Sequence, residues 1–280
     1  MDPEILLRLT VPHDDINGVL ASVPRGDARR ELERHVTAFT GAMGRPGQRF
    51  DIPEEAVEEY GPYFYVHVYL ETLPHARAYH RERGVPDEVS WATLRDLGRH
   101  MAVHRRRHDA PGLNAPWWPQ LHFRGMLYQL GRLQFERAEL GETIAAGITG
   151  LPHRAGDPVL SVHIPDFLGP MSPQACDDSF ARAKAFFAEH FPHEEHSLAV
   201  CFSWLLDRQL GAYLPGSNIA AFQERFREAY SVPGNGLIPF VYGRDLPPDE
   251  LPRRTALEKV VADHLAGGGS WHLTAGYAPL

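Results

Sequence analysis

The sequence predicts an α+β protein in which a helical N-terminal domain is followed by a domain of β-strands flanked by helices. Two observations lead to this prediction. Apolar residues recur at helical spacing before residue 109, whereas short apolar strands alternate with amphipathic helices after residue 119. A turn-rich stretch, DAPGLNAPWWP, separates the two patterns. We therefore predict a helical domain over residues 1–118 and a second domain over residues 119–280.

Three segments carry the helical pattern of the first domain. The segment DARRELERHVTAF places Leu32, Val36 and Phe39 on one face of a helix. The segment PYFYVHVYLETLPHARAYHRE begins with proline and is followed by Gly84, as helices commonly are. The segment SWATLRDLGRHMAVHRRRH predicts a further helix, with Ser90 as its N-cap.

The second domain begins with strands that surround one well-marked helix. A helix running into a strand is expected in LHFRGMLYQLGRLQFERAEL, and ETIAAGITG is expected to be the next strand. Residues 159–164 form a strand, and the following helix begins at Ser172, which can cap it, and Pro173, which suits its first turn. Residues 198–206 then form the next strand.

The remaining elements alternate in the same way. The segment NIAAFQERFREAY predicts a helix capped by Ser217 or Asn218, and LIPFVYG predicts a strand. A capping box from Thr255 to Glu258 opens a helix that ends at Gly267. The segment WHLTAGY is expected to be the final strand.

The composition indicates what the protein binds. The formal net charge is −8 over 280 residues, so no overall positive field attracts nucleic acid or an anionic membrane. Two cysteines, Cys176 and Cys201, form neither a disulfide framework nor a CxxC pair. The N-terminus lacks the apolar core of a signal peptide, and no apolar run reaches membrane-spanning length. We expect a cytoplasmic protein whose partner is a small molecule.

The sixteen histidines raise the question of a metal site. His100, His104 and His108 recur every four residues, but the arginines at 105–107 would repel a divalent cation. The HEEH sequence at 193–196 is not the HExxH zinc motif. We expect no metal, and we interpret the histidine-rich helix end as a basic, partly solvated surface.

Polar residues follow two strands that we expect to be parallel neighbours. His163 and Asp166 end one strand, and Ser203 and Asp207 end the other, with the helix after Ser172 crossing between them. The carboxyl ends of parallel strands carry the functional loops of a sheet, and free N–H groups at a helix start favour an anion. The sequence therefore predicts a site at this edge.

Each candidate has more than one interpretation. His163 is either a general base or a strand-end imidazole bound to a loop carbonyl, and Asp166 either orients it or caps the turn begun by Pro165. Ser203 can bind a carbonyl oxygen, although no GxSxG elbow supports a serine hydrolase. Cys201 lies mid-strand, where cysteines are usually inert packing; we place it among the residues that line the substrate pocket.

Taken in order, several of these segments resemble one family. They are TLRDLGRHM, HRRRH, LHFRGMLYQLGRLQFE, VLSVHIP, ACDDSFARAKAFF, CFSWLLD, LPGSNIAAFQERF and TALEKVVADHL. The chain resembles the bacterial acyltransferase-domain proteins, which join a helical N-acyltransferase N-terminal domain to a GNAT-like C-terminal domain. The resemblance implies a GNAT-type mixed sheet in the second half. It also implies transfer of an acyl group from a thioester, acyl-CoA or another donor, to an amine.

In GNAT enzymes two parallel strands splay apart, the thioester lies between them, and its pyrophosphate rests on the following helix start. The resemblance thus implies a donor site at Ile164, Gly169, Ser172 and Asn218. The usual loop, Q/R-x-x-G-x-G/A, is absent; DFLGPMSP stands in its place and offers only Gly169 for close backbone approach.

Direct attack of an amine on a thioester needs a base and a group that polarises the carbonyl. We nominate His163 as base, with Ser203 or a strand N–H for the carbonyl oxygen. Gln134 and Glu136 share a strand face and either line the acceptor pocket or form a solvated surface. Two alternatives stay open: a non-catalytic binding or scaffold protein, and a thioester hydrolase.

Overall fold

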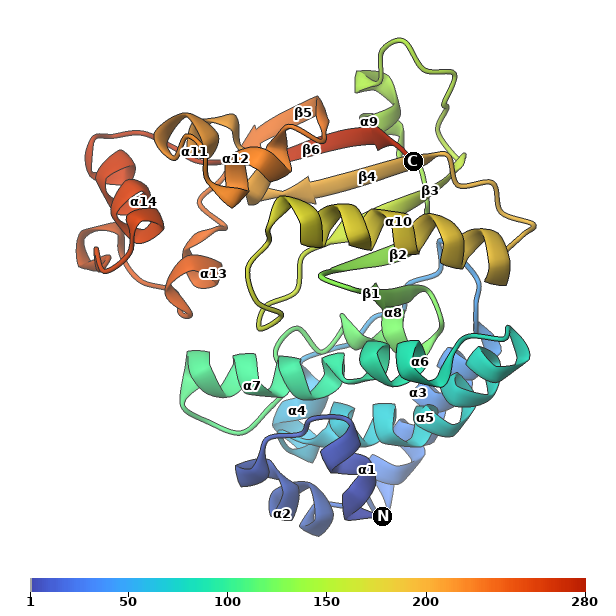
Figure 1. The fold of residues 1–280 in the computed structure, drawn as a ribbon. Helices are drawn as coiled ribbons and strands as arrows, with labels where there is room; N and C mark the ends of the chain where they lie inside the picture. The colour runs from blue at the N-terminus through green and yellow to red at the C-terminus, as the bar shows by residue number, and fades with distance from the viewer. Residues whose placement is uncertain (1) are drawn as a thin grey trace. The chain divides into compact units, whose positions relative to one another are not determined.

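The computed structural model describes residues 2–280 and divides into two compact units after Gln129 (Figure 1). Residues 119–129 belong to the helical unit, although the turn-rich stretch suggested a break before them. The reason is packing: the Gln120 amide bonds the backbone of Phe50, and the Arg124 guanidinium bonds the carbonyl of Gln48 at 2.6 Å. Arg124 is fully buried and is held by backbone oxygens of the same unit.

The helical unit is built around one buried helix, α5 (Phe64–Glu82). Its apolar and aromatic residues are buried on nearly every side, as is typical of a helix at the centre of a bundle. The helices predicted at residues 27–39 and 62–82 are confirmed. The segment from Ser90 to His108, predicted as one helix with Ser90 as its N-cap, instead forms two helices, Asp87–Leu94 and Asp96–His108. Ser90 lies inside the first of them, where its buried hydroxyl contacts His80 Nδ1 at 2.6 Å. The other helices are α1 (Pro3–Arg8), α2 (His13–Ala21), α3 (Asp27–Gly41), α4 (Glu55–Tyr60), α6 (Asp87–Leu94), α7 (Asp96–His108) and α8 (Pro119–Phe123).

The second unit contains a mixed sheet in the order β1-β2-β3-β4-β6-β5, whose first strand crosses the boundary between the units at Gln129 (Figure 1). Parallel pairing occurs between β3 and β4, whereas β2–β3, β4–β6 and β5–β6 are antiparallel. The expected strand–helix–strand unit with parallel strands is therefore confirmed. The strands are β1 (Leu127–Leu130), β2 (Leu133–Glu139), β3 (Pro158–His163), β4 (Leu198–Ser203), β5 (Arg227–Pro233) and β6 (His272–Pro279).

Helix α10 (Pro173–His190) connects β3 to β4 and packs on the sheet with its apolar stripe. The Ser172 hydroxyl accepts a hydrogen bond from Ala175 N at 3.2 Å, which confirms the predicted cap. Cys176, Ala183 and Phe187 are buried, as their spacing predicted. A separate hydrophobic cluster contains the buried residues Val159, Leu198, Val200 and Tyr277. Helix α9 (Glu142–Gly147) packs against this cluster.

Three predicted elements are wrong. The segment ETIAAGITG forms α9 rather than a strand, because its alanines and first-turn glutamate favour a helix. The helix expected over NIAAFQERFREAY ends at Gln223, and Arg227–Pro233 pairs with β6 as an edge strand instead. The segment LIPFVYG forms the helix α13 (Ile238–Tyr242), which ends at Gly243 with a φ of 77°.

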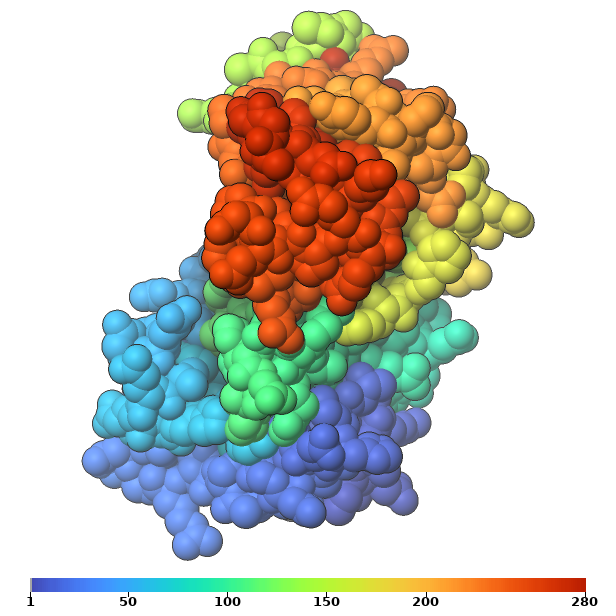
Figure 2. Space-filling model, turned by 90° about the vertical axis from the view of Figure 1, so that its left-hand side faces the viewer, coloured from blue at the N-terminus to red at the C-terminus, as the bar shows by residue number. Residues whose placement is uncertain are grey.

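The C-terminal helices form a small lobe of their own, coloured orange to red in Figure 2. Its core gathers around Trp271, which is 1% exposed, together with Leu237 and Val261. The predicted capping box is confirmed, since Thr255 and Glu258 each bond the other's backbone N–H. The remaining elements are η1 (Trp204–Leu206), α11 (Arg208–Tyr213), α12 (Asn218–Gln223), η2 (Pro248–Glu250) and α14 (Ala256–Ala266).

Candidate active site

The two parallel strands separate toward their carboxyl ends. Register pairing between β3 and β4 covers only Leu160 with Ala199 and Ser161 with Val200. By contrast, β3 pairs with β2 as far as His163, and β4 pairs with β6 as far as Ser203. The sheet therefore opens between β3 and β4 after Ser161 and Val200, and the opening is bordered by peptide groups of both strands.

His163 lies at the end of β3, at the edge of this opening. Its Nε2 atom is 2.9 Å from Oε2 of Glu136, and the two side chains are 23% and 9% exposed. The β2–β3 register pairs Gln134 with His163 and Glu136 with Ser161, so all four side chains share one face of the sheet. Gln134 and Glu136 are buried, so this face is not a solvated one.

The carboxylate of Glu136 determines which nitrogen of the His163 ring carries the hydrogen. A carboxylate oxygen only accepts hydrogen bonds, so the hydrogen lies on Nε2 and a proton taken up by the ring is received at Nδ1. Glu136 also stabilises the positive charge that the ring gains in doing so. From the sequence, Asp166 either orients this ring or caps the turn begun by Pro165; the structure places the carboxylate of Glu136 at the ring.

Ser203 ends β4 and caps the short helix η1. Its hydroxyl oxygen accepts a hydrogen bond from Leu205 N at 3.2 Å. A serine hydroxyl carries one hydrogen and two acceptor lone pairs, so capping leaves its O–H group able to donate. The position is therefore compatible with a bond to a carbonyl oxygen.

The loop between β3 and α10 is held by an arginine that the sequence reasoning missed. Arg132 donates to the carbonyl oxygens of Pro165 at 3.0 Å and Gly169 at 2.9 Å. Gly169 has a φ of 75°, and a Cβ added there would meet nothing within 4 Å, so the backbone is open to a ligand. The only sequence signal for Arg132 is its place in the turn between β1 and β2.

The remaining residues predicted to bind donor or substrate lie after β3, at the start of α12 and within β4. Ile164 is half-buried directly after β3, and Asp166 lies in the loop beyond it. Asn218 is the first residue of α12, where Ser217 supplies the cap by accepting from Ala220 N at 3.2 Å. Cys201 is fully buried, and burial raises the pKa of its thiol to about 12. Its thiol is therefore inert packing, without the surface needed for the expected substrate contact.

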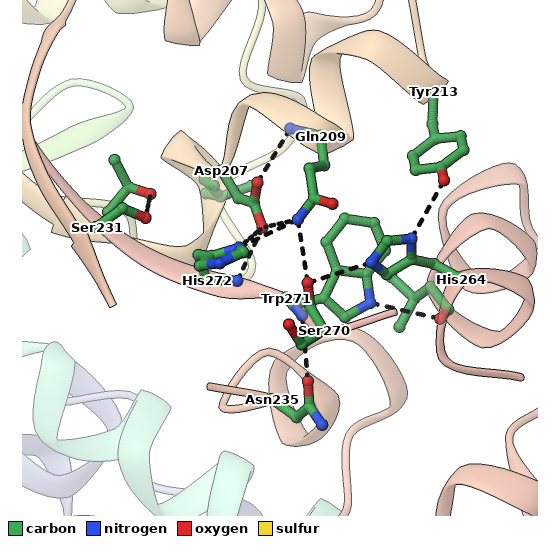
Figure 3. A network of polar contacts seen from close by, with 12 residues as sticks. Asp207, Gln209, Tyr213, Ser231, Asn235, His264, Ser270, Trp271 and His272 are labelled. Atoms are coloured by element: carbon green, nitrogen blue, oxygen red, sulfur yellow. Dashed lines mark hydrogen bonds and ion pairs between the residues drawn. The ribbon is translucent and has the colours of Figure 1, made fainter. Parts of the chain in front are cut away.

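Asp207 also departs from the sequence interpretation. Its buried carboxylate caps α11 and accepts from Gln209 N at 3.0 Å and from His272 N at 2.8 Å, which ties the end of β4 to the start of β6 (Figure 3). Beyond it, His264 contacts the Tyr213 hydroxyl at 3.1 Å and the Ser270 carbonyl at 3.2 Å. These contacts stabilise the lobe next to the sheet.

Part of the histidine-rich helix α7 packs in the interior of the helical unit. Asp96 Oδ2 lies 3.2 Å from His100 Nε2 and 3.1 Å from His122 Nε2, and Asp96 and His122 are buried. Burial opposes ionisation of Asp96, but the nearby histidines and Arg99 outweigh it and hold its pKa below the usual range. Within residues 2–280, no three His, Cys, Asp or Glu side chains are grouped to hold a metal ion. Over the same residues, no helix is long and apolar enough to cross a bilayer.

A mixed sheet that opens between two parallel strands, with a helix starting beside the gap, is the architecture of GNAT-like acyltransferases. A model of the GNAT-like C-terminal domain matches residues 127–278, and one of the N-acyltransferase N-terminal domain matches residues 2–125. The chain belongs to the family of acyltransferases that join these two domains, and it is an acyltransferase. The resemblance and the GNAT-type sheet expected from the sequence are thereby confirmed.

Solved structures agree with this assignment. The crystal structure of an acyltransferase in complex with decanoyl-CoA and teicoplanin is 37% identical, covers 99% of this chain and 87% of that chain, and has a TM-score of 0.86. A structure in complex with CoA and 10C-Teicoplanin has the same identity and coverage and a TM-score of 0.87. A third, with decanoyl-CoA, is 35% identical over 99% and 86% of the chains, with a TM-score of 0.88. No curated protein matches the chain.

Proposed function

We propose that this acyltransferase moves an acyl group from acyl-CoA to an amine of a small-molecule acceptor by direct attack. The observation that carries the proposal is the opening between β3 and β4 with the His163–Glu136 pair at its edge. Solved relatives at 35–37% identity were crystallised with decanoyl-CoA and with teicoplanin, which makes these the first donor and acceptor to test.

The reaction exchanges the C–S bond of the thioester for a C–N bond, and the proton of the amine ends on the sulfur of CoA. The amine nitrogen attacks the thioester carbonyl carbon, a C–N bond forms, and the C–S bond breaks to release the CoA thiolate. His163 takes the amine proton at Nδ1, while Glu136 holds the hydrogen on Nε2 and stabilises the resulting imidazolium. The proton then passes from the ring to the departing thiolate, so the base is regenerated.

The negative charge that develops on the carbonyl oxygen needs a hydrogen-bond donor. The Ser203 O–H group and the peptide N–H groups that border the opening are the candidates. Gln134, which pairs with His163 across β2 and β3, places an amide on the same face and lines the acceptor side together with Glu136. These groups lie on strands, which hold them in fixed positions.

The donor phosphates are assigned to the start of α10. Ser172, Gly169, Ile164 and Asn218 remain the proposed donor-binding residues. Two arginines compensate for the missing glycine motif: Arg132 bonds the loop before α10, and Arg225 donates to Pro173 O at 2.9 Å. Cations beside a helix N-terminus favour a diphosphate more strongly than the helix alone does.

The test is an assay of CoA release and product formation with decanoyl-CoA and teicoplanin. We expect His163→Ala to lower kcat by roughly 10²- to 10⁴-fold, the usual contribution of a general base, with the melting temperature unchanged. His153→Ala is the matched control, since His153 is a half-buried histidine whose Nε2 contacts the Ser197 hydroxyl away from the opening. Full activity in His163→Ala would remove the base from the proposal.

The two alternatives give different outcomes in the same experiment. A thioester hydrolase would release CoA and free decanoate without acylated acceptor. A non-catalytic binding protein would gain thermal stability with acyl-CoA but release no CoA. Acylated product that depends on His163 supports the transferase and contradicts both.

A further inference from the structure

The face of the sheet that carries His163 leaves a large apolar side chain exposed. Helix α10 packs on the other face, where Phe180 meets Phe135 of β2 with ring centroids 5.4 Å apart. On the His163 face, the cluster against which α9 packs reaches as far as Val200, which is 5% exposed. The next residue of β4 on this face is Phe202, and it is 49% exposed. A half-exposed phenylalanine beyond a covered stretch indicates a surface that a ligand can use.

Phe202 stands across the opening from His163. The β3–β4 register pairs Ser161 with Val200, and His163 and Phe202 follow two residues later on their strands. Side chains two residues apart on a strand share a face, so the imidazole and the phenyl ring border the opening from opposite sides. An amine that gives its proton to His163 therefore has Phe202 as its neighbour on the β4 side.

A second ring extends this surface across the sheet. Phe202 of β4 and Tyr230 of β5 both pair with Ala275 of β6, which lies between them (Figure 1). The two ring centroids are 5.8 Å apart and the ring planes differ by 31°. Ala275 is small and fully buried, so the rings form one continuous surface. We call Phe202, Ala275 and Tyr230 the aromatic platform; two strand spacings are roughly 10 Å, about the length of two linked aromatic rings.

The position and shape of the aromatic platform indicate what occupies it. The base takes its proton from the acceptor, so the acceptor amine lies on the face that carries His163. The donor diphosphate is assigned to the start of α10, which packs on the other face. Beyond Tyr230 on the same strand face, Val232 is 39% exposed, so the surface is open rather than enclosed. An open, flat pair of rings suits the face of a planar ring better than a flexible acyl chain.

We propose that the aromatic platform binds an aromatic ring system of the acceptor and so selects amines whose nitrogen is attached close to planar rings. The inference rests on the proposed function and deepens it, because it gives the acceptor a chemical class. His163 receives the proton, while Phe202 and Tyr230 hold the rings on the β4 side. Since the platform acts on binding and not on the proton transfer, its removal should change the KM for the acceptor and leave kcat unchanged.

The test measures acylation of two amines by decanoyl-CoA. The first is 4-phenylbenzylamine, whose two rings can cover the platform, and the second is propylamine, which has no ring. Phe202→Ala should raise the KM for 4-phenylbenzylamine about tenfold, because apolar contact and a ring pair are both lost. The KM for propylamine and both kcat values should not change. The melting temperature should also stay the same, because Phe202 is half-exposed.

Three further variants serve as matched controls. Phe202→Tyr keeps the ring and should behave as the unaltered protein does. Phe202→Leu keeps apolar surface without a ring, so its KM for 4-phenylbenzylamine should lie between those of the unaltered protein and Phe202→Ala. Trp117→Ala removes a ring of similar exposure, 46%, from the helical unit and should change neither KM.

Three results would overturn the inference. An equal rise in KM for both amines would show that the platform does not recognise rings. A changed preference between decanoyl-CoA and acetyl-CoA, with the acceptor KM unchanged, would show that Phe202 holds the acyl chain. A dimer that dissociates in Phe202→Ala, with both KM values unchanged, would show that the platform is a contact between two copies of the chain.

Failure of the inference and failure of the proposed function are distinguishable. If both amines are acylated and neither KM depends on Phe202, the platform is not the acceptor site and the transferase proposal stands. If no amine is acylated, the proposed function fails. Calorimetric binding of 4-phenylbenzylamine that is lost in Phe202→Ala would then still support the platform, and absence of binding would overturn it as well.

Discussion

Substituting Glu136 by glutamine tests the chemical core of the site with the smallest change in shape. The variant keeps the size of the side chain at 2.9 Å from His163 Nε2 but removes its charge. At a separation near 4 Å and an effective dielectric constant of about 20, a full charge pair is worth about 4 kcal/mol. The imidazole is about a quarter exposed, at 23%, so solvent screens part of this. We take about 2–3 kcal/mol as the loss in the transition state, or roughly 30- to 150-fold in kcat.

The assay is steady-state release of CoA, with product confirmed by mass. We expect kcat to fall and the KM for acyl-CoA to change little, because Glu136 acts through the imidazole and not on the donor. Glu139→Gln is the matched control: Glu139 lies on the same strand but is exposed at its end. The Glu136→Gln, His163→Ala double variant should be no slower than His163→Ala alone, since the two residues form one unit.

Two results would refute this reasoning. Activity of Glu136→Gln within threefold of the unaltered protein, an allowance of about 0.7 kcal/mol, would show that the carboxylate does not support the base. Fully additive effects in the double-variant cycle would show that Glu136 and His163 act separately. In either case the proton would have to leave the amine by another route.

Three further predictions concern stability and reactivity. Ser172→Ala should destabilise the protein by about 1 kcal/mol in urea denaturation, because Ala175 N loses its cap; an unchanged midpoint would contradict this. Cys201 should resist alkylation in the native protein but react after unfolding, since burial raises its pKa to about 12; fast native labelling would show that the strand opens. Burial opposes ionisation of Glu194, but bonds from Arg137 and His196 lower its pKa to about 2; its contribution to stability should be complete above pH 4.5 and lost as pH falls toward 2. In acid denaturation, the Arg137→Met variant should not show this loss of stability.

The sequence alone determined the features that depend on neighbouring residues. The cap at Ser172 and the box from Thr255 to Glu258 were predictable because each hydrogen bond joins residues three apart. The parallel pair β3–β4 followed from the strand–helix–strand pattern, and with it the placement of His163 at the end of a strand. These signals also carried the resemblance to the acyltransferase family.

The tertiary structure decided what depends on pairing between distant segments. Residues 227–230 continue a helical pattern in the sequence, but hydrogen bonds to β6 make them a strand, because pairing across a sheet outweighs weak local propensity. Asp166 is near His163 in the chain, yet the β2–β3 register puts Glu136 at the imidazole from 27 residues away.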